Sequence, residues 1–340
     1  MNHKKLVYIG FSYQHHGEFS GYDQIRKTGI YNKIIDVQKS FNFYFNLKNN
    51  SKNILIRVFN KVFLPYIWWI ELRLIFISLL SPNKYIFHFI YGENLYRFFG
   101  KFKMKNEIVL TLHQPPTILK SNASFIKSLK RVDKIIVMSE EMEQHLKSLF
   151  PDKSICYIPH GVDTKHFIPG KQRIKNQILQ IGNWLRDFEL ASEVYKYLST
   201  IDDSLKIFIV ARKKYHYYFK TNNNAICLSD INDNYLLQLF QSSNIVFLPL
   251  KDFTANNSII EAMSCGCEVV IGTQKKNWHI NEGLNIHFVE NDHVKIGNYL
   301  IELLTNKIDS SSNNRTYVIN NYDWKVIGKK TRSFIYNENL

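Results

Sequence analysis

Hydrophobic and polar positions along the chain form a repeating pattern, in which a short apolar run is followed by a longer mixed stretch. Apolar runs bounded by turn residues are typical of strands that are buried on both faces of a parallel sheet. The stretch SEEMEQHLKSLF (139–150) predicts a helix that begins at Ser139, because Ser is a good cap and three acidic residues follow soon after. The runs of the first half are KLVYIG (5–10), FNFYFN (41–46), YIFHFI (85–90), EIVLTLH (107–113), KIIVMS (134–139) and ICYIP (155–159).

The pattern stops once and then starts again. The segment IPHGVDTKHFIPGKQRIKN (158–176) is rich in Pro, Gly and basic residues and predicts a linker between domains. Two series of alternating strands and helices predict an α/β protein with two doubly wound, Rossmann-like domains. Two such domains that face each other place a ligand in the cleft between them. The runs of the second series are QILQIG (177–182), LKIFIVA (205–211), AICLSD (225–230), NIVFLPL (244–250), EVVIG (268–272) and IHFVEN (286–291).

One apolar stretch, from residue 62 to 80, does not fit a plain Rossmann unit. Its length is close to that of a membrane span, but Pro65, Glu71 and Arg73 interrupt it. Three interpretations stay open at this point. The stretch is a core helix of the first domain, an aromatic helix that lies in the membrane interface, or a true span.

Charge is distributed unevenly over the chain. Of the 44 Lys and Arg, 24 lie in residues 1–170 beside 12 of the 29 Asp and Glu, so that half carries +12 of the net +15. A basic first half favours an anionic partner such as a membrane surface. The four cysteines show no metal-finger spacing and are interpreted as small buried residues in a reducing compartment. No signal peptide is recognisable, so we expect a cytoplasmic protein.

A lone carboxylate, Glu261, stands in the small and apolar stretch TANNSIIEAMSCG (254–266). The preceding run predicts a strand, and NNSIIEAM predicts a helix capped by Asn256 or Asn257. The start of a helix binds anions such as phosphate. A carboxylate one turn later would repel a phosphate but can accept hydrogen bonds from the two hydroxyls of a ribose. The stretch therefore predicts a nucleoside diphosphate site; the other interpretation is a capped helix with a solvated Glu261.

Several motifs together resemble one family. TANNSIIEAMSCGCEVVIG (254–272) is similar to the donor-site motif of retaining GT-B glycosyltransferases, specifically glycosyltransferase family 4. In the same order along the chain, further segments resemble the parts of that family, and together they span most of residues 105–336. They are IVLTLHQPP (108–116), CYIPHGVDTKHFIP (156–169), ILQIGNWLRDFE (178–189) and NYDWKVIGKKTRSFIY (321–336).

The resemblance implies a GT-B fold and roles for individual residues. It implies an acceptor domain over 1–162, a donor domain over 163–320 and a C-terminal helix, 321–340, that crosses back to the first domain. Glu261 matches the ribose-binding glutamate, and His113 matches the active-site histidine near the transferred sugar. The donor diphosphate is assigned to Arg186, to a second cation, Arg212 or Lys213, and to the helix start at Asn256, Asn257 and Ser258. Gly17, Ser20 and Gly21 are donor-loop candidates, and Tyr91 and Glu93 are acceptor candidates.

The chain departs from the family at one position. Many members carry a second glutamate eight residues before the first, where this chain has Phe253 with Asp252 beside it. Asp252 can serve after a shift of one residue, or the carboxylate is absent. The departure leaves the donor site in place but puts any mechanism that uses that side chain in doubt.

The resemblance implies a metal-independent, retaining transfer of a sugar from a UDP- or GDP-sugar to a hydroxyl acceptor. The expected acceptor is a saccharide or lipid-linked molecule in polysaccharide, lipopolysaccharide or glycolipid synthesis. The basic first half and the 62–80 stretch place the protein on the inner face of the cell membrane as a peripheral protein. The chain has no Asp-x-Asp motif, so we expect neither metal nor cofactor. No nucleic-acid module is recognisable. The alternative is a non-catalytic, donor-binding GT-B homologue that acts as a partner subunit.

Overall fold

A computed structural model describes residues 4–13, 17–38, 66–273, 284–305 and 311–338 of the chain. The chain divides into two compact units. The first consists of Met1–Gln14, Gly21–Pro159 and Ile327–Leu340, and the second of His15–Ser20 and His160–Val326. The division after Pro159 falls shortly before the sequence-based boundary at 162/163, and it places six N-terminal residues in the second unit.

The first unit is built on a parallel sheet of six strands in the order β2-β1-β3-β4-β5-β6. Five of them match apolar runs of the sequence, and the inner residues of β1, β3, β4 and β5 are almost completely buried, whereas only Ile155 of β6 is. The strand predicted at 41–46 lies outside the described residues. The strands are β1 (Lys5–Gly10), β2 (Lys33–Asp36), β3 (Tyr85–Phe89), β4 (Glu107–Leu112), β5 (Lys134–Val137) and β6 (Ser154–Tyr157).

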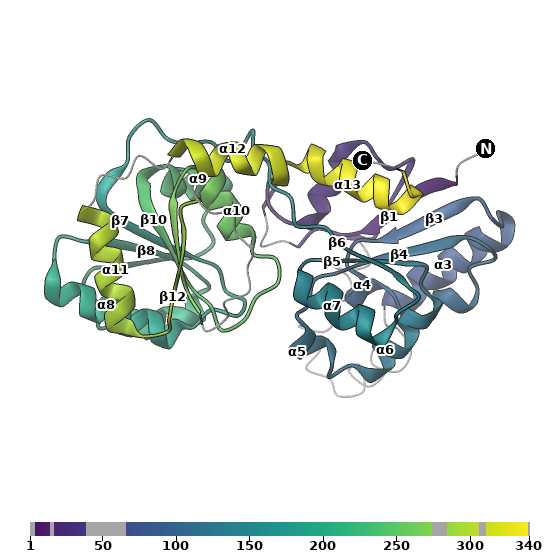
Figure 1. Ribbon diagram of the computed structural model, residues 1–340, viewed down its shortest axis with the longest axis horizontal. Helices are drawn as coiled ribbons and strands as arrows, with labels where there is room; N and C mark the ends of the chain where they lie inside the picture. Colours follow the sequence, from purple (N-terminus) through teal and green to yellow (C-terminus); the bar gives the residue numbers. More distant parts are fainter. Residues whose placement is uncertain (1–3, 14–16, 39–65, 274–283, 306–310, 339–340) are drawn as a thin grey trace. The chain divides into compact units, whose positions relative to one another are not determined.

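Helices lie on both sides of this sheet (Figure 1). α3, α4, α6 and α7 lie on one side, and α13 lies on the other. The predicted cap of α7 is confirmed, since the Ser139 hydroxyl accepts the Met142 N–H at 3.2 Å. The helical segments are η2 (Tyr22–Thr28), α3 (Tyr66–Leu80), α4 (Gly92–Leu95), η3 (Phe99–Lys101), α5 (Pro116–Leu119), α6 (Ala123–Ser128), η4 (Leu129–Arg131), α7 (Glu140–Leu149) and α13 (Trp324–Tyr336).

The second unit is built on another parallel sheet of six strands, in the order β12-β11-β10-β7-β8-β9. Strand order reverses between β7 and β10, and ligands of such sheets bind beyond the carboxyl ends of the strands at this point. Every strand predicted for the second half is present. The strands are β7 (Ile174–Ile181), β8 (Lys206–Val210), β9 (Ala225–Leu228), β10 (Ser243–Pro249), β11 (Glu268–Gly272) and β12 (Ile286–Val289).

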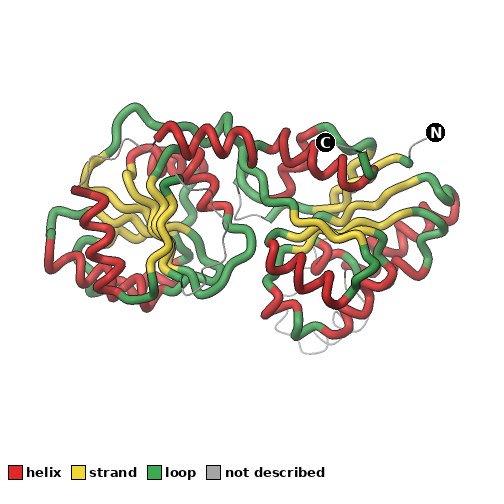
Figure 2. The backbone as a smooth tube through the Cα atoms, in the orientation of Figure 1, coloured by secondary structure: helices red, strands yellow, loops and turns green. Residues whose placement is uncertain are grey.

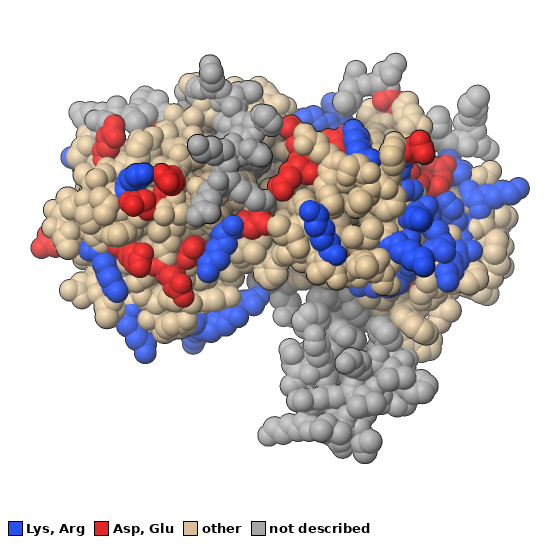
Figure 3. Space-filling view, turned by 60° about the horizontal axis from the view of Figure 1, so that its bottom comes forward, with Lys and Arg blue, Asp and Glu red and all other residues tan. Residues whose placement is uncertain are grey.

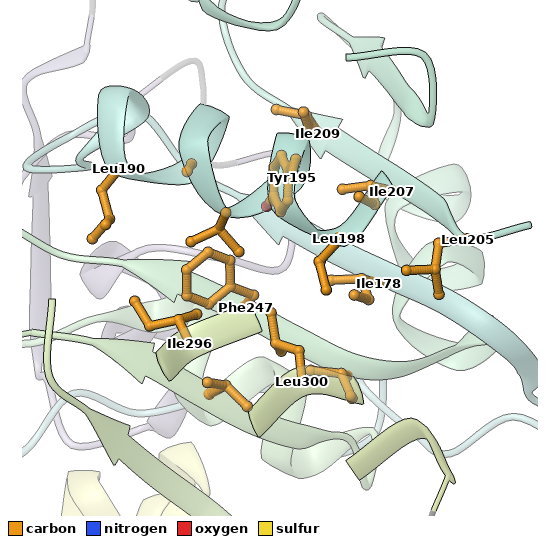
Figure 4. Close-up of a cluster of buried hydrophobic side chains, with 14 of the residues drawn as sticks. Ile178, Leu190, Tyr195, Leu198, Leu205, Ile207, Ile209, Phe247, Ile296 and Leu300 are labelled. Carbon is orange, nitrogen blue, oxygen red and sulfur yellow. The ribbon is translucent and has the colours of Figure 1, made fainter. Parts of the chain in front are cut away.

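Two apolar clusters hold the second sheet between its helices (Figure 2). In one cluster, Tyr195 and Leu198 of α8 and Ile296 and Leu300 of α11 pack over the strands around Phe247 (Figure 4). The other cluster joins α9, α10 and α12 to the opposite face of the sheet. The helical segments are α8 (Phe188–Ile201), η5 (Lys213–Phe219), α9 (Asp233–Ser242), α10 (Asn257–Ser264), α11 (His293–Thr305) and α12 (Ser311–Tyr322).

The structure corrects the interpretation of the cysteines in part. Cys265 and Cys267 are buried, but Cys156 and Cys227 are only half-buried. The predicted linker also ends earlier than expected, because β7 already begins at Ile174.

Helix α3 covers residues 66–80 of the 62–80 stretch, and residues 62–65 lie outside the described residues. Among the described residues, no helix has the length and apolarity that a membrane crossing needs. One side of α3 is buried and carries Glu71, whose Oε1 accepts the N–H groups of Arg97, Phe98 and Phe99 at 2.7, 3.0 and 3.1 Å. The charge inside the apolar stretch thus anchors the helix to the start of η3. The other side is exposed and consists mainly of large apolar residues: Trp68, Trp69, Leu72, Phe76, Leu79 and Leu80.

Candidate functional site

Arg186 lies in the loop that follows β7, at the strand-order reversal of the second sheet. Its Nε donates to the Ile181 carbonyl at 2.9 Å, so the side chain folds back over the end of the strand. Gly182 makes this possible. Its φ is +108°, and a Cβ at this position would lie 2.5 Å from Nη2 of Arg186. The tight turn therefore fixes the guanidinium beside the end of the sheet.

The guanidinium of Arg186 is surrounded by neutral groups. Nη2 lies 3.3 Å from Oδ1 of Asn256 and 3.5 Å from Oγ of Ser258. Burial lowers the pKa of Arg186 to about 10, so the side chain stays charged at neutral pH. Among the described residues, no carboxylate lies within ion-pair distance of it. A partly buried cation without a counter-ion is an arrangement that favours an anionic ligand.

Helix α10 begins beside this cation. Its cap is Asn256, whose Oδ1 accepts the Ser258 N–H at 3.2 Å, and Asn257 is the first helical residue. The sequence left these two residues open as caps, and the structure selects Asn256. The helix dipole adds partial positive charge at this end, which complements the charge of Arg186. Arg186 and the start of α10, the groups of the second unit that were predicted to bind phosphate, therefore lie together.

Glu261 follows one turn further along α10 and is only 4 % exposed. Its Oε1 accepts a hydrogen bond from the Ser20 hydroxyl at 2.6 Å. The pKa of this carboxyl is raised to about 7, chiefly by burial; the Ser20 hydrogen bond lowers it, and the negative charge of Asp233 adds to the rise. Near neutral pH, the carboxyl group is therefore only partly ionised.

The remaining predicted residues of the second unit lie after β8 and β10. Arg212 follows β8, and its backbone N–H donates to Oδ1 of Asn183 at 2.7 Å, which ties it to the Arg186 loop while its side chain is exposed. Lys213 is the exposed first residue of η5. Asp252 accepts the Phe253 N–H at 2.7 Å, so one carboxylate oxygen is turned toward its own backbone.

Sequence reasoning missed one cation at this edge of the sheet. Lys251 is the second residue after the end of β10, and its N–H donates to the Leu185 carbonyl at 3.0 Å. Its ammonium group is more than half exposed and lies 4.0 Å from Oδ1 of Asp187. The signal that could have found it is its place in the loop between β10 and the helix that carries Glu261.

His113 comes directly after β4 in the first unit. Its Nε2 lies 2.8 Å from the Ile90 carbonyl, which can only accept, so Nε2 carries the proton and Nδ1 is the acceptor. Burial lowers the pKa of His113 below the ordinary value, partly offset by the charge of Glu93, and the ring is neutral at pH 7. Its ring contacts Tyr22 in an edge-on arrangement and Tyr91 in a tilted one, with ring centroids 4.8 and 4.9 Å away.

The two acceptor candidates lie next to His113, where β3 ends. Glu93 is buried, and its Oε1 accepts the backbone N–H groups of His113 and Gln114, the latter at 2.8 Å. Its contacts therefore hold the chain after β4 in place. Tyr91 is also buried, and its ring packs on Phe11 and Tyr13 as well as on His113. Both residues are therefore buried and make structural contacts with the chain around His113.

The glycine-containing loop after β1 is divided between the two units. Gly17 and Ser20 belong to the second unit, and Gly21 belongs to the first. Gly17 and Gly21 both have positive φ, +63° and +97°. Over the described ranges, no group of three His, Cys, Asp or Glu side chains has the geometry to hold a metal ion.

Comparison with known proteins gives structural neighbours. The sequence matches no protein-family model and no curated protein. Anabaena Alr3699/HepE, solved in complex with UDP and glucose, has 12 % identity and a TM-score of 0.70 over 98 % of this chain and 100 % of its own. Sucrose-phosphate synthase (tll1590) from Thermosynechococcus elongatus has 15 % identity and a TM-score of 0.68 over 98 % and 99 %.

A third neighbour is longer than this chain. A mutant of S. aureus TarM, solved in complex with fondaparinux, alpha-GlcNAc-glycerol and UDP, has 14 % identity and a TM-score of 0.64 over 79 % of this chain. The chain spans only 58 % of the TarM chain. Together with the two parallel six-stranded sheets and their flanking helices, these likenesses define the fold. The protein has a GT-B fold with two Rossmann-like units.

Proposed function

We propose that this protein is a retaining glycosyltransferase, similar to glycosyltransferase family 4, that transfers a sugar from a nucleoside diphosphate sugar to a hydroxyl acceptor. The observation that carries the proposal is the surroundings of Arg186. Among the residues that the structure describes, no carboxylate pairs with this charged guanidinium, which lies against the start of α10, and a buried carboxylate follows one turn later in the same helix. A nucleoside diphosphate complements both features.

The diphosphate is the part of the donor that Arg186 and the start of α10 would bind. A phosphate oxygen can take the place of Oδ1 of Asn256 at Nη2, where the contact of 3.3 Å is long for a charged donor. Lys251 and Arg212 offer a second positive charge from neighbouring loops. The ribose hydroxyls are assigned to Glu261, the buried carboxylate of this helix. UDP-bound neighbours of the same fold, HepE and TarM, support a nucleotide in this role.

The reaction breaks the bond between the anomeric carbon and the diphosphate oxygen and forms a bond from that carbon to the acceptor oxygen. Negative charge grows on the leaving diphosphate, and groups fixed in place to stabilise it lower the barrier most effectively. Arg186 and the start of α10 supply that stabilisation, so we expect no divalent metal. A retaining, front-face route passes the acceptor proton to the departing phosphate, and it requires no second carboxylate at Phe253.

His113 is assigned to the transferred sugar by its resemblance to the family histidine. Its neutral ring and fixed tautomer make Nδ1 a hydrogen-bond acceptor for a sugar hydroxyl. Glu93 is a positioning residue in this proposal, because it holds the backbone of His113 and Gln114. The acceptor is a saccharide or a lipid-linked molecule of polysaccharide, lipopolysaccharide or glycolipid synthesis.

Membrane contact is assigned to the exposed side of α3, which we call the α3 apolar face: Trp68, Trp69, Leu72, Phe76, Leu79 and Leu80. Each of these side chains is between 50 % and 69 % exposed, which is unusual for so many large apolar groups on one short helix. Aromatic side chains at the edge of such a face are typical of helices that lie in the membrane interface.

Positive charge and further apolar groups lie near the C-terminal end of α3. The loop before β4 alternates between the two kinds: Lys101 and Lys105 lie beside Phe102 and Met104, which are 42 % and 40 % exposed, while Lys103 between them forms an ion pair with Asp133. This loop is tied to the residues just after α3, since the Asn83 N–H donates to the Met104 carbonyl at 3.1 Å. Lys and Arg also gather on part of the first unit in Figure 3. An anionic lipid surface complements this combination.

The donor site is tested by thermal unfolding with UDP, GDP and ADP, with and without a chelator, for the wild type, Arg186→Ala and Glu261→Ala. A ligand of the native state raises Tm by mass action. We expect one nucleotide to stabilise the wild type, with or without chelator, and to lose its effect in both variants. Lys196→Ala, an exposed cation of α8, is the matched control and keeps the shift. If no nucleotide changes Tm, the proposal is wrong.

A turnover assay distinguishes a glycosyltransferase from a non-catalytic, donor-binding partner subunit. Wild-type protein that binds a nucleotide is incubated with the matching nucleotide sugar and candidate acceptors, and free nucleoside diphosphate is measured. Release that depends on acceptor supports the transferase. Binding without release on any acceptor supports a partner subunit that has retained the fold.

A further inference from the structure

Ser20 and Glu261 make a contact that the proposed function does not use. The two residues are 241 positions apart in the sequence, yet the Ser20 hydroxyl donates to Oε1 of Glu261 at 2.6 Å within the second unit. Glu261 is the carboxylate assigned to the ribose. A hydroxyl of the chain itself therefore lies where a hydroxyl of the ligand is expected.

We propose that Ser20 is an internal substitute for the ribose hydroxyl, and that it determines donor affinity by competing with the nucleotide for Glu261. This inference rests on the proposed function, because it takes the carboxylate of Glu261 as the ribose acceptor. The class of ligand follows from the contact: a molecule that presents at least one hydroxyl to a buried carboxylate. Donor binding must then break the Ser20 hydrogen bond and replace it.

The segment around Ser20 is seated on the second unit through two further contacts. The Glu18 N–H donates to Oδ2 of Asp233 at 2.7 Å, and the ring of Phe19 stacks on His166 with centroids 3.7 Å apart and planes 1° apart. Both contacts go to residues of the second unit outside α10. They hold the Ser20 hydroxyl at Glu261 in the absence of ligand.

Gly17 shows how closely this segment is fitted. Its φ is +63°, and a Cβ there would lie 2.0 Å from Oδ1 of Asp233. Only glycine allows the backbone to approach that carboxylate so closely. Gly17 and Glu18 are exposed, whereas Phe19 is half-buried and packs against the apolar cluster around α9, α10 and α12, so displacement of the segment costs this contact as well.

Glu261 needs a hydrogen-bond donor both with and without a ligand, so the Ser20 hydroxyl and the ribose hydroxyls compete for the same carboxylate. A buried carboxylate with no donor is costly, and the hydroxyl of Ser20 reduces that cost in the ligand-free protein. A ribose offers two hydroxyls to the same carboxylate and is the better partner once the diphosphate is bound. Because the contact stabilises the free state only, removal of the Ser20 hydroxyl should favour the bound state.

The experiment compares wild type with Ser20→Ala by calorimetric titration with UDP, GDP and ADP at about pH 8, where Glu261 is mostly ionised. We expect Ser20→Ala to bind the matching nucleotide several-fold more tightly, about fivefold for a lost hydrogen bond of typical strength. The corresponding 2′,3′-dideoxynucleotide gives equal affinities with the two proteins, because it offers nothing to Glu261. Ser199→Ala, which removes a hydroxyl bonded to a helix carbonyl, is the matched control.

Gly17→Ala provides a second variant that displaces the segment while retaining Ser20. It should tighten nucleotide binding in the same direction. Equal or weaker binding by both Ser20→Ala and Gly17→Ala, with a wild type that binds, overturns the competition but leaves the donor site. If the two variants bind the nucleotide and the wild type does not, Ser20 blocks the donor site almost completely, which also supports the competition. Absence of binding in all three proteins overturns the competition together with the proposed function.

Discussion

Nε2 of His113 donates to the backbone carbonyl of Ile90 at 2.8 Å, which joins the residue after β4 to the residue after β3. A carbonyl oxygen cannot donate, so this contact decides which ring nitrogen carries the proton. The same contact holds the ring plane between Tyr22 and Tyr91. The contact thus fixes the tautomer of the neutral ring, with the proton on Nε2 and Nδ1 unprotonated.

Substitution of His113 should affect turnover more than donor binding. Gln can place an amide N–H near Nε2 and retain the bond to Ile90, but it offers no acceptor at the position of Nδ1. We expect His113→Gln and His113→Ala to reduce kcat about a hundredfold or more, the effect of losing a group that acts in the transition state. Nucleotide affinity should stay close to that of the wild type, because the groups proposed to bind the diphosphate and ribose, Arg186, the start of α10 and Glu261, lie in the second unit.

The pH profile gives a second test of His113. Because burial keeps the ring neutral, its protonation contributes no step to kcat near the ordinary histidine pKa of 6.5. A kcat profile that falls with a midpoint near 6.5 in the wild type and becomes flat in His113→Gln contradicts the fixed neutral ring.

Glu93 should act as a positioning residue. Its carboxylate binds two successive backbone N–H groups, so Glu93→Ala leaves both without their partner in a buried region. We expect the free energy of unfolding to fall by about 2 kcal/mol, measured by urea titration. The kcat should fall as well, with little change in donor affinity. Glu93→Gln retains one acceptor oxygen and recovers part of both losses, which a direct role of the charge in acceptor binding would not allow.

Gly182 should be necessary for donor binding although it has no side chain. Gly182→Ala forces a methyl group against Nη2 of Arg186 and places a non-glycine residue at φ +108°. We expect nucleotide affinity to fall at least about tenfold, as measured by calorimetry. Gly29→Ala is the matched control, since its φ is +79° but no atom lies within 4 Å of the new Cβ. The control shares the backbone strain and keeps the affinity, which isolates the effect on Arg186.

Much of this fold is readable from the sequence because most strands are buried on both faces. Runs such as EVVIG (268–272) are then apolar without interruption and cannot be confused with an exposed strand. The edge strand β2 was missed for the opposite reason. Only Ile35 of its four residues is buried, so Lys33–Asp36 shows no apolar run. An edge strand has one neighbour, and its sequence is correspondingly less constrained.

The candidate site is readable only where neighbours in sequence are also neighbours in space. Asn256, Ser258 and Glu261 share one helix start, and their spacing alone indicated an anion site next to a carboxylate. The Ser20 contact and the backbone contacts of Glu93 join residues far apart in the chain, so no local pattern encodes them. That no carboxylate in the described part of the chain pairs with Arg186 is likewise a property of three-dimensional packing.

Donor affinity should depend on pH through Glu261. A ribose donates to the ionised carboxylate, and the pKa of Glu261 is raised to about 7 in the ligand-free protein. Below that value the group must lose a proton before it can bind, at a cost of about 1.4 kcal/mol per pH unit. Nucleotide affinity therefore rises with pH up to about pH 8 and then levels off. Glu261→Gln should bind weakly and without this dependence.

The same shift makes a prediction about stability. A folded pKa above the ordinary 4.5 means that the folded state binds more protons than the unfolded state between pH 4.5 and about 7, so the free energy of unfolding falls as pH rises through this window. Above it, Glu261→Gln should be more stable than the ligand-free wild type by up to about 3 kcal/mol. The exposed Glu193→Gln is the control and leaves the pH dependence unchanged. Parallel stability curves for Glu261→Gln and wild type would falsify the raised pKa.

Membrane binding should depend on the α3 apolar face and on negative lipid charge together. The double variant Trp69→Ser/Phe76→Ser removes two side chains that are 62 % and 63 % exposed, so the fold loses little while the apolar surface shrinks. In flotation with vesicles of equal parts phosphatidylglycerol and phosphatidylcholine, we expect the wild type to bind and the variant to lose most of its binding. Leu149→Ser/Ile201→Ser, at sites 45 % and 47 % exposed, is the matched control and binds as the wild type does.

Pure phosphatidylcholine vesicles should bind the wild type weakly, because the basic loop before β4 then has no anionic partner. Equal flotation of wild type and the Trp69/Phe76 variant would show that α3 is not the docking helix.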